Sequence, residues 1–222
     1  MKYISFPIFK VCGLRNGANI RAVENAGADW LGMIFYEKSP RYVEQQPDYL
    51  PLAPKWRVGV FVNASYDMVI EKSKLFSLSA VQLHGSCPTS LCEQLKAEGL
   101  HVIKAIAVTD GFEAEATSYA SVCDLFLFDT PTIAFGGSGK SYNWDLLKAY
   151  KGPLPFLLSG GLSVSSIPDL LTFHHPYLIG YDLNSGFEIS AGMKDARLIA
   201  QFIDCIKSKY SHLSYPTTGI RC

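Results

Sequence analysis

Eight short apolar runs, separated by segments with helical spacing, constrain the fold of this chain more than any other feature of its sequence. The runs are rich in β-branched and aromatic residues, which is typical of strands buried on both faces of a parallel sheet. Between several runs, apolar residues recur every three or four positions, as at Val164, Ile167 and Leu171. The runs occupy residues 8–11, 30–35, 58–62, 80–83, 102–106, 125–128, 156–158 and 177–179.

Two architectures accommodate this alternation: a closed (β/α)8 barrel and an open, doubly wound sheet. Eight units favour the closed barrel, and 222 residues, 48% of them hydrophobic, suffice for one core. We therefore expect an α/β fold, a single-domain (β/α)8 TIM barrel over residues 1–222. An N-terminal extension at 1–9 and a C-terminal tail at 209–222 are expected to flank it. The helical pattern is weakest near Asp67 and in segment 111–121.

Charge and cysteine content exclude several classes of partner. The 20 basic and 20 acidic side chains give a formal net charge of zero, so the sequence has no electrostatic footprint for nucleic acid. No apolar run approaches membrane-spanning length. The six cysteines form no CxxC pair and there is no signal-peptide pattern, so we expect free thiols in a reducing cytoplasm. No metal-ligand spacing occurs, and a small molecule is the expected partner.

Two reactive side chains close apolar runs. Cys12 follows the first run and precedes Gly13, and Asp129 follows the sixth run. The strand ends of a parallel barrel meet at one face, so both side chains are candidates for one pocket. A thiolate at Cys12, its pKa lowered by the helix that begins near Asn16, is a base or nucleophile, and a desolvated Asp129 is an acid. A packed core thiol and a capping or salt-bridged carboxylate are the alternatives.

Glycine-rich loops follow the seventh and eighth runs, where barrels often bind phosphate. Gly160 and Gly161 follow the seventh run, and a helix is expected to begin near Ser163. Backbone amides and the positive end of a helix dipole bind a dianion without Lys or Arg. The loop after the eighth run contains Asn184, Ser185 and Gly186. These loops predict a phosphate site, and ordinary βα turns are the alternative.

Three further loops contain candidate site residues. Arg41 lies after the second run and is a candidate to clamp a carboxylate, with a solvated loop arginine as the alternative. Gly136, Gly137 and Gly139 form a flexible active-site loop after the sixth run, which lacks the spacing of a nucleotide-binding P-loop. His84, after the fourth run, is a proton-transfer group or a loop histidine bonded to backbone.

Eight strings along the chain match one family in order and spacing. They are Lys10-Val11-Cys12-Gly13-Leu14, Ala26-Gly27-Ala28-Asp29, Ser39-Pro40-Arg41, Val58-Gly59-Val60-Phe61-Val62-Asn63, Val81-Gln82-Leu83-His84-Gly85, Asp129-Thr130, Gly136-Gly137-Ser138-Gly139-Lys140 and Ser159-Gly160-Gly161-Leu162. Over about nine-tenths of its length the chain resembles the phosphoribosylanthranilate isomerases of tryptophan biosynthesis.

The resemblance implies the conversion of N-(5-phosphoribosyl)anthranilate to 1-(2-carboxyphenylamino)-1-deoxyribulose 5-phosphate, an Amadori rearrangement that needs no cofactor. It implies that Cys12 is the general base and removes the proton from the sugar C2. Asp129 corresponds to the general acid, which protonates the ribose ring oxygen. Arg41 corresponds to the contact with the anthranilate carboxylate, and the loops after the seventh and eighth runs correspond to the phosphate grip. A monomer or weak homodimer is expected.

The chain departs from the family pattern after the eighth run. The family usually shows Asp-Val-Ser-Ser-Gly where this chain reads Asp182-Leu183-Asn184-Ser185-Gly186, so the phosphate contacts there stay open. Arg15 adds a positive charge, which we hypothesise favours the Cys12 thiolate. Two other functions also stay open. One is another phosphosugar isomerisation on the same barrel, and the other is a catalytically silent barrel that binds a phosphorylated ligand.

Overall fold

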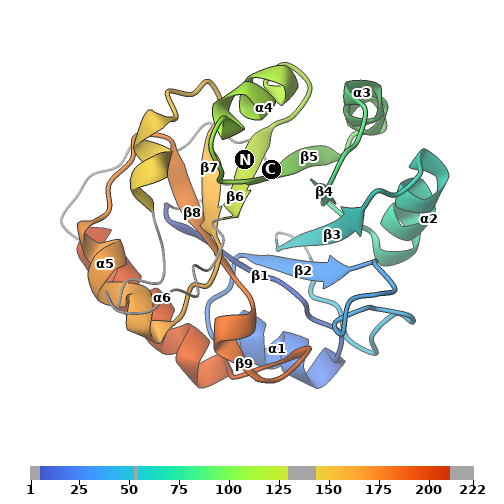
Figure 1. Cartoon of the computed structure of the whole chain (residues 1–222). Coiled ribbons are helices and arrows are strands. Elements are labelled where there is room, and N and C mark those ends of the chain that lie inside the picture. The colour runs from blue at the N-terminus through green and yellow to red at the C-terminus, as the bar shows by residue number, and fades with distance from the viewer. Residues whose placement is uncertain (1–5, 53–54, 130–143, 211–222) are drawn as a thin grey trace.

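Eight parallel strands form a closed barrel in chain order, and Figure 1 shows helices packed around it. The computed structural model describes residues 6–52, 55–129 and 144–210. β8 pairs with β1, with Lys10 opposite Asp182, and this pairing closes the ring. The strands are β1 (Ile8–Val11), β2 (Trp30–Ile34), β3 (Trp56–Val62), β4 (Ala80–His84), β5 (His101–Ala107), β6 (Leu125–Asp129), β7 (Phe156–Ser159) and β8 (Leu178–Leu183). The closed barrel predicted from the eight runs is therefore confirmed.

The eighth strand differs most from its apolar run. The run at 177–179 predicted a short strand, whereas β8 continues to Leu183. Gly and Asp are depleted in strands, so Gly180 and Asp182 obscured this continuation. Gly180 is required here because a Cβ at this position would lie 2.1 Å from the carbonyl oxygen of Ile8. The longer strand brings Asp182 to the level of the cavity at the barrel mouth.

Helices follow most strands. Asn16 caps α1 by accepting a hydrogen bond from the Asn19 amide over 2.9 Å, and Ser65 caps α2 in the same way. The predicted helix start near Ser163 is confirmed, with a first turn that is 3-10: the capping Ser163 amide donates to Ser166 Oγ. The helices are α1 (Gly17–Asn25), α2 (Tyr66–Phe76), α3 (Thr89–Ala97), α4 (Phe112–Tyr119), α5 (Ile167–Thr172) and α6 (Ala196–Tyr210), with 3-10 turns η1 (Trp144–Ala149), η2 (Val164–Ser166) and η3 (Ser185–Phe187).

Two main apolar cores, and a small cluster of Cys12, Ile34 and Val60, follow from the alternation of side chains along the strands. The larger core lies between the strands and the helices and includes Phe128 and Phe202. The smaller core fills the barrel and includes Trp30 and Trp56, whose rings stack 4.5 Å apart. Toward the carboxyl ends of the strands the interior becomes polar. This change of character positions the functional site.

β1 and α6 extend into the segments that the sequence assigned to the flanks of the barrel. Ile8 and Phe9, placed in the expected extension, lie in β1, and Lys209 and Tyr210, placed in the expected tail, end α6. Cys12, Cys87, Cys92, Cys123 and Cys205 are free thiols. Within the described ranges, no helix combines the length and apolar character that crossing a membrane requires.

The inner core predicts the cost of removing one of its side chains. Leu157 lies inside the barrel with no exposed surface, so Leu157→Ala should destabilise the protein by about 2–5 kcal/mol. Leu75→Ala is the matched control, because Leu75 is 51% exposed on α2, and should cost less than about 1 kcal/mol. Urea unfolding of both variants measures the difference. Equal losses would contradict the assignment of Leu157 to the core.

Candidate active site

A cavity of about 400 Å³ opens at the carboxyl ends of the strands. Six residues predicted for the site line it, namely Cys12, Asp129, Gly160, Gly161, Asn184 and Ser185. Gly186 lies beside them, where a Cβ would come within 2.1 Å of the Leu162 carbonyl oxygen. Gly136, Gly137 and Gly139 lie outside the described residues. The structure therefore brings the end of β1, the end of β6 and the loops after β7 and β8 to one space.

Cys12 directly follows β1 at the wall of the cavity. Its side chain has room because Gly32, on the neighbouring strand, has no Cβ: one would lie 3.1 Å from Cys12 Sγ. Burial raises the pKa of Cys12. Lys10 and Lys194 lower this pKa, but the effect of burial is larger. The expected lowered pKa is thus wrong, since the dry environment penalises the thiolate. Arg15 is exposed and donates to the Ala191 carbonyl oxygen over 3.3 Å, and the main cations acting on Cys12 are the two lysines.

Lys10 and Asp182 form a fully buried ion pair below Cys12. Lys10 Nζ donates to Asp182 Oδ1 over 2.7 Å, and the two residues are direct neighbours across β1 and β8. Burial alone would lower the pKa of Lys10, but Asp182 and the Cys12 thiol outweigh burial and raise it. Lys10 therefore stays charged next to Cys12. The sequence contained both residues but did not show that they pair.

Asp129 ends β6 and lies at the mouth of the same cavity. Although it is exposed there, partial desolvation by the cavity walls raises the pKa of Asp129, and the negative charge of Asp182 adds to the effect. Its carboxyl group is therefore protonated over a wider pH range than an ordinary aspartate. This direction agrees with the prediction of an acid at this position.

His84 and Gln82 also line the cavity. The sequence left two roles open for His84. Their Nε2 atoms lie 2.5 Å apart, so the histidine contacts a side chain rather than the backbone. Burial lowers the pKa of His84 to about 4, with contributions from Lys10 and Lys104. His84 is accordingly a neutral imidazole at neutral pH. It is suited to hydrogen bonding and not to holding a positive charge.

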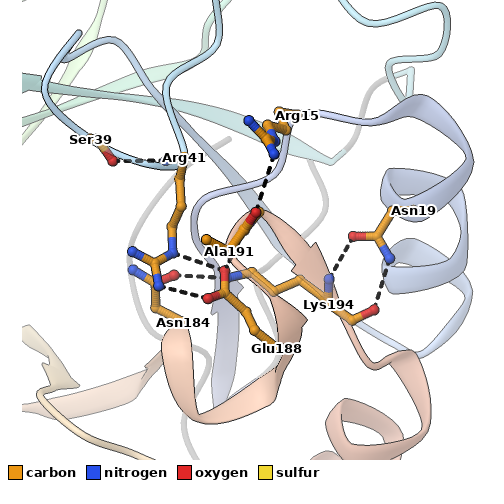
Figure 2. A network of polar contacts seen from close by, with 9 residues as sticks. Arg15, Asn19, Ser39, Arg41, Asn184, Glu188, Ala191 and Lys194 are labelled. Atoms are coloured by element: carbon orange, nitrogen blue, oxygen red, sulfur yellow. Dashed lines mark hydrogen bonds and ion pairs between the residues drawn. The ribbon is translucent and has the colours of Figure 1, made fainter.

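Arg41 belongs to a network of polar contacts beside the cavity, shown in Figure 2. Its Nε and Nη2 atoms donate to the two carboxylate oxygens of Glu188 over 2.8 and 2.6 Å. Lys194 Nζ donates to Glu188 Oε1 and to Asn184 Oδ1, each over 2.7 Å. Glu188 and Lys194 were missed in the sequence because β9 (Glu188–Ser190) and β10 (Met193–Lys194) form a small polar hairpin without an apolar pattern.

The charges of this network set the protonation of Glu188. Burial alone would raise the pKa of Glu188, but hydrogen bonds from Arg41, Lys194 and the Gly192 amide lower it to about 2. Burial lowers the pKa of Lys194, against the opposing effects of Glu188 and Cys12. Among the described residues, no group of three or more His, Cys, Asp or Glu side chains is arranged to hold a metal ion.

Comparison with known proteins decides the family. The model of one family, N-(5'-phosphoribosyl)anthranilate (PRA) isomerase, matches residues 9–205. The chain belongs to the phosphoribosylanthranilate isomerase family. It is therefore an isomerase, and the resemblance read from the eight strings is confirmed.

Individual relatives match this isomerase over nearly its whole length. An N-(5'-phosphoribosyl)anthranilate isomerase from Phocaeicola vulgatus is 48% identical over 203 residues, which are 91% of this chain and 98% of the relative. The crystal structure of the isomerase from Thermotoga maritima is 33% identical with a TM-score of 0.76, covering 91% of this chain and 99% of that one. A phosphoribosylanthranilate isomerase in complex with reduced 1-(o-carboxyphenylamino)-1-deoxyribulose 5-phosphate is 31% identical with a TM-score of 0.75, at the same coverage.

The lowered pKa of Glu188 predicts how stability depends on pH. A carboxyl with a depressed pKa in the folded isomerase stabilises it fully above its unfolded value of 4.5. The contribution is lost as the pH falls toward about 2. The stability difference between the native protein and Glu188→Gln should therefore be constant above about pH 5 and shrink below it. Urea unfolding at several pH values measures it, with the surface variant Glu71→Gln as control. A difference that grows on acidification would contradict the ion pairs of Glu188.

Proposed function

We propose that the cavity converts N-(5'-phosphoribosyl)anthranilate to 1-(2-carboxyphenylamino)-1-deoxyribulose 5-phosphate by general acid–base catalysis, as a step of tryptophan biosynthesis. The observation that carries this proposal is that Cys12, directly after β1, and Asp129, the last residue of β6, line one cavity. The reaction needs one group that gives a proton and another that takes one. These two side chains supply both.

Asp129 is the proposed general acid. Its protonated carboxyl gives a proton to the ribose ring oxygen as the bond from that oxygen to C1 breaks. The nitrogen lone pair then forms a Schiff base with C1, and the furanose opens. The raised pKa of Asp129 keeps the proton available for this step.

Cys12 is the proposed general base. Its thiolate removes the proton from the sugar C2, and the electrons of that bond move to the Schiff base to give an enolamine. Tautomerisation of the enolamine then gives the ketone. Lys10 and Lys194 favour the thiolate against the cost of burial. The rearrangement oxidises C2 while it reduces C1, so no external oxidant or reductant enters the balance.

The two ends of the substrate have separate proposed contacts. The Arg41 edge that contains Nε is occupied by Glu188, which leaves Nη1 for the anthranilate carboxylate. The loops after β7 and β8 are the proposed phosphate site. Gly160 and Gly161 have φ values of +92° and +62°, a backbone conformation that favours glycine and turns the chain sharply at the cavity wall.

The proposal requires only one chain and a small-molecule substrate, because every residue given a role belongs to one barrel. We therefore propose that the chain acts as a monomer or weak homodimer. Its five described free thiols are compatible with a reducing compartment such as the cytoplasm.

Removing either catalytic group tests the proposed function. Cys12→Ala and Asp129→Asn should each lower kcat by at least about 100-fold, because each deletes a proton-transfer group. Loss of anthranilate fluorescence from phosphoribosylanthranilate generated in the cuvette measures turnover, and circular dichroism checks the fold. Cys205→Ala and Asp145→Asn are matched controls outside the cavity and should retain activity.

The outcomes separate the assignments from the reaction. Native protein that consumes the substrate while Cys12→Ala remains fast would refute Cys12 as base, and fast Asp129→Asn would refute Asp129 as acid. Folded native protein without turnover would refute the proposed function.

A further inference from the structure

We propose that Lys194 is a positioning residue that keeps the charge of Arg41 available for the substrate carboxylate and stabilises the thiolate of Cys12. This inference rests on the proposed function, because it concerns how Arg41 and Cys12 are prepared for their roles. Lys194 itself lies behind Glu188 and acts through its neighbours.

Hydrogen bonds hold both the backbone and the side chain of Lys194. The side chain has no exposed surface, and its ammonium contacts Glu188 and Asn184. The Asn19 side chain of α1 accepts from the Lys194 amide over 2.9 Å and donates to its carbonyl oxygen over 2.8 Å. Figure 2 shows these contacts on opposite sides of the residue. A lysine fixed in this way holds its charge at one defined point.

A count of charges shows why the position matters. Arg41 and Glu188 alone form a bidentate pair with no net charge, which would attract a substrate carboxylate weakly. Lys194 is a second cation on the same carboxylate, at 2.7 Å from Glu188 Oε1. The three side chains together therefore have one net positive charge.

The same charge acts on Cys12. Four charged groups influence the thiol: Lys10, Asp182, Lys194 and Arg41. Asp182, at 2.7 Å from Lys10, offsets part of the effect of Lys10 on the thiol. Lys194 adds a second positive charge that favours the thiolate. Lys194 thus links the base to the carboxylate site.

Asn184 extends this link to the proposed phosphate loop. Its Oδ1 accepts from Lys194, while its backbone begins the turn η3 at the cavity wall. A Cβ at Gly13 would lie 3.0 Å from that Oδ1 and 2.6 Å from Arg41 Cδ, so glycine at 13 allows this packing. Lys194 therefore contacts a loop whose sequence departs from the family pattern.

The experiment compares Lys194→Met, Lys194→Arg and the double variant Lys194→Met/Glu188→Gln. Their ligand is reduced 1-(o-carboxyphenylamino)-1-deoxyribulose 5-phosphate, and calorimetry gives its Kd. Lys194→Met should weaken binding about tenfold, since it leaves Arg41 neutralised by Glu188. Lys194→Arg should bind almost as well as the native protein. The double variant should recover most of the loss, because it removes the neutralising carboxylate as well.

A second measurement follows the thiol. Iodoacetamide alkylation of Cys12, located by mass spectrometry, should reach its midpoint at higher pH in Lys194→Met than in the native protein. Lys148→Met is the matched control, since Lys148 is 69% exposed and pairs with Asp145 outside the cavity, and it should change neither readout.

Several results would overturn the inference. A double variant that folds but binds as weakly as Lys194→Met would show that Lys194 matters only for structure. An unchanged alkylation midpoint would refute the effect on Cys12. If Lys194→Met does not fold, the double variant, which has no carboxylate at position 188, still decides the charge argument. Native-like binding by Arg41→Met would instead refute the carboxylate assignment under the proposed function, whatever Lys194 does.

Discussion

Pairing of β8 with β1 is the constraint on which the rest of the site depends. It places Lys10 opposite Asp182, so the buried ion pair forms across the seam that closes the barrel. The Cys12 amide donates to the Leu183 carbonyl oxygen over 2.8 Å and continues this pairing beyond the end of β1. A buried charge that loses its partner is costly, so closure of the barrel and the local charge balance at Cys12 are coupled.

Cys12 and Asp129, the polar groups above this seam, have different proposed roles because their surroundings differ. Burial raises the pKa of both Cys12 and Asp129, which helps an acid and opposes a thiolate base. The barrel compensates only at Cys12, through Lys10 below it and Lys194 beside it. The negative charge of Asp182 raises the pKa of both groups. The two groups thus become suited to opposite proton transfers.

The sequence predicts the place of a side chain correctly where the periodicity of the chain directly determines that place. Residues directly after an apolar run, such as Cys12 and Asp129, must lie at the mouth once the strands are parallel, and both line the cavity. It failed where contacts join segments far apart in the chain. Glu188 and Lys194 lie in a short hairpin with no apolar signal, yet they contact Arg41 and Asn184. The pKa of Cys12 was predicted in the wrong direction because local sequence suggests helix dipoles but does not measure burial.

The central claim is that the closed barrel holds the sugar between Cys12 and Asp129. The most direct test is a crystal structure of this isomerase with reduced 1-(o-carboxyphenylamino)-1-deoxyribulose 5-phosphate. We expect Cys12 Sγ against the sugar C2 and the Asp129 carboxyl about 2.6–3.2 Å from the O4 hydroxyl, which corresponds to the former ring oxygen. The phosphate should lie in the loops after β7 and β8, and the carboxylate next to Arg41. A ligand with C2 facing Asp129, or with its phosphate at Arg41, would contradict the account.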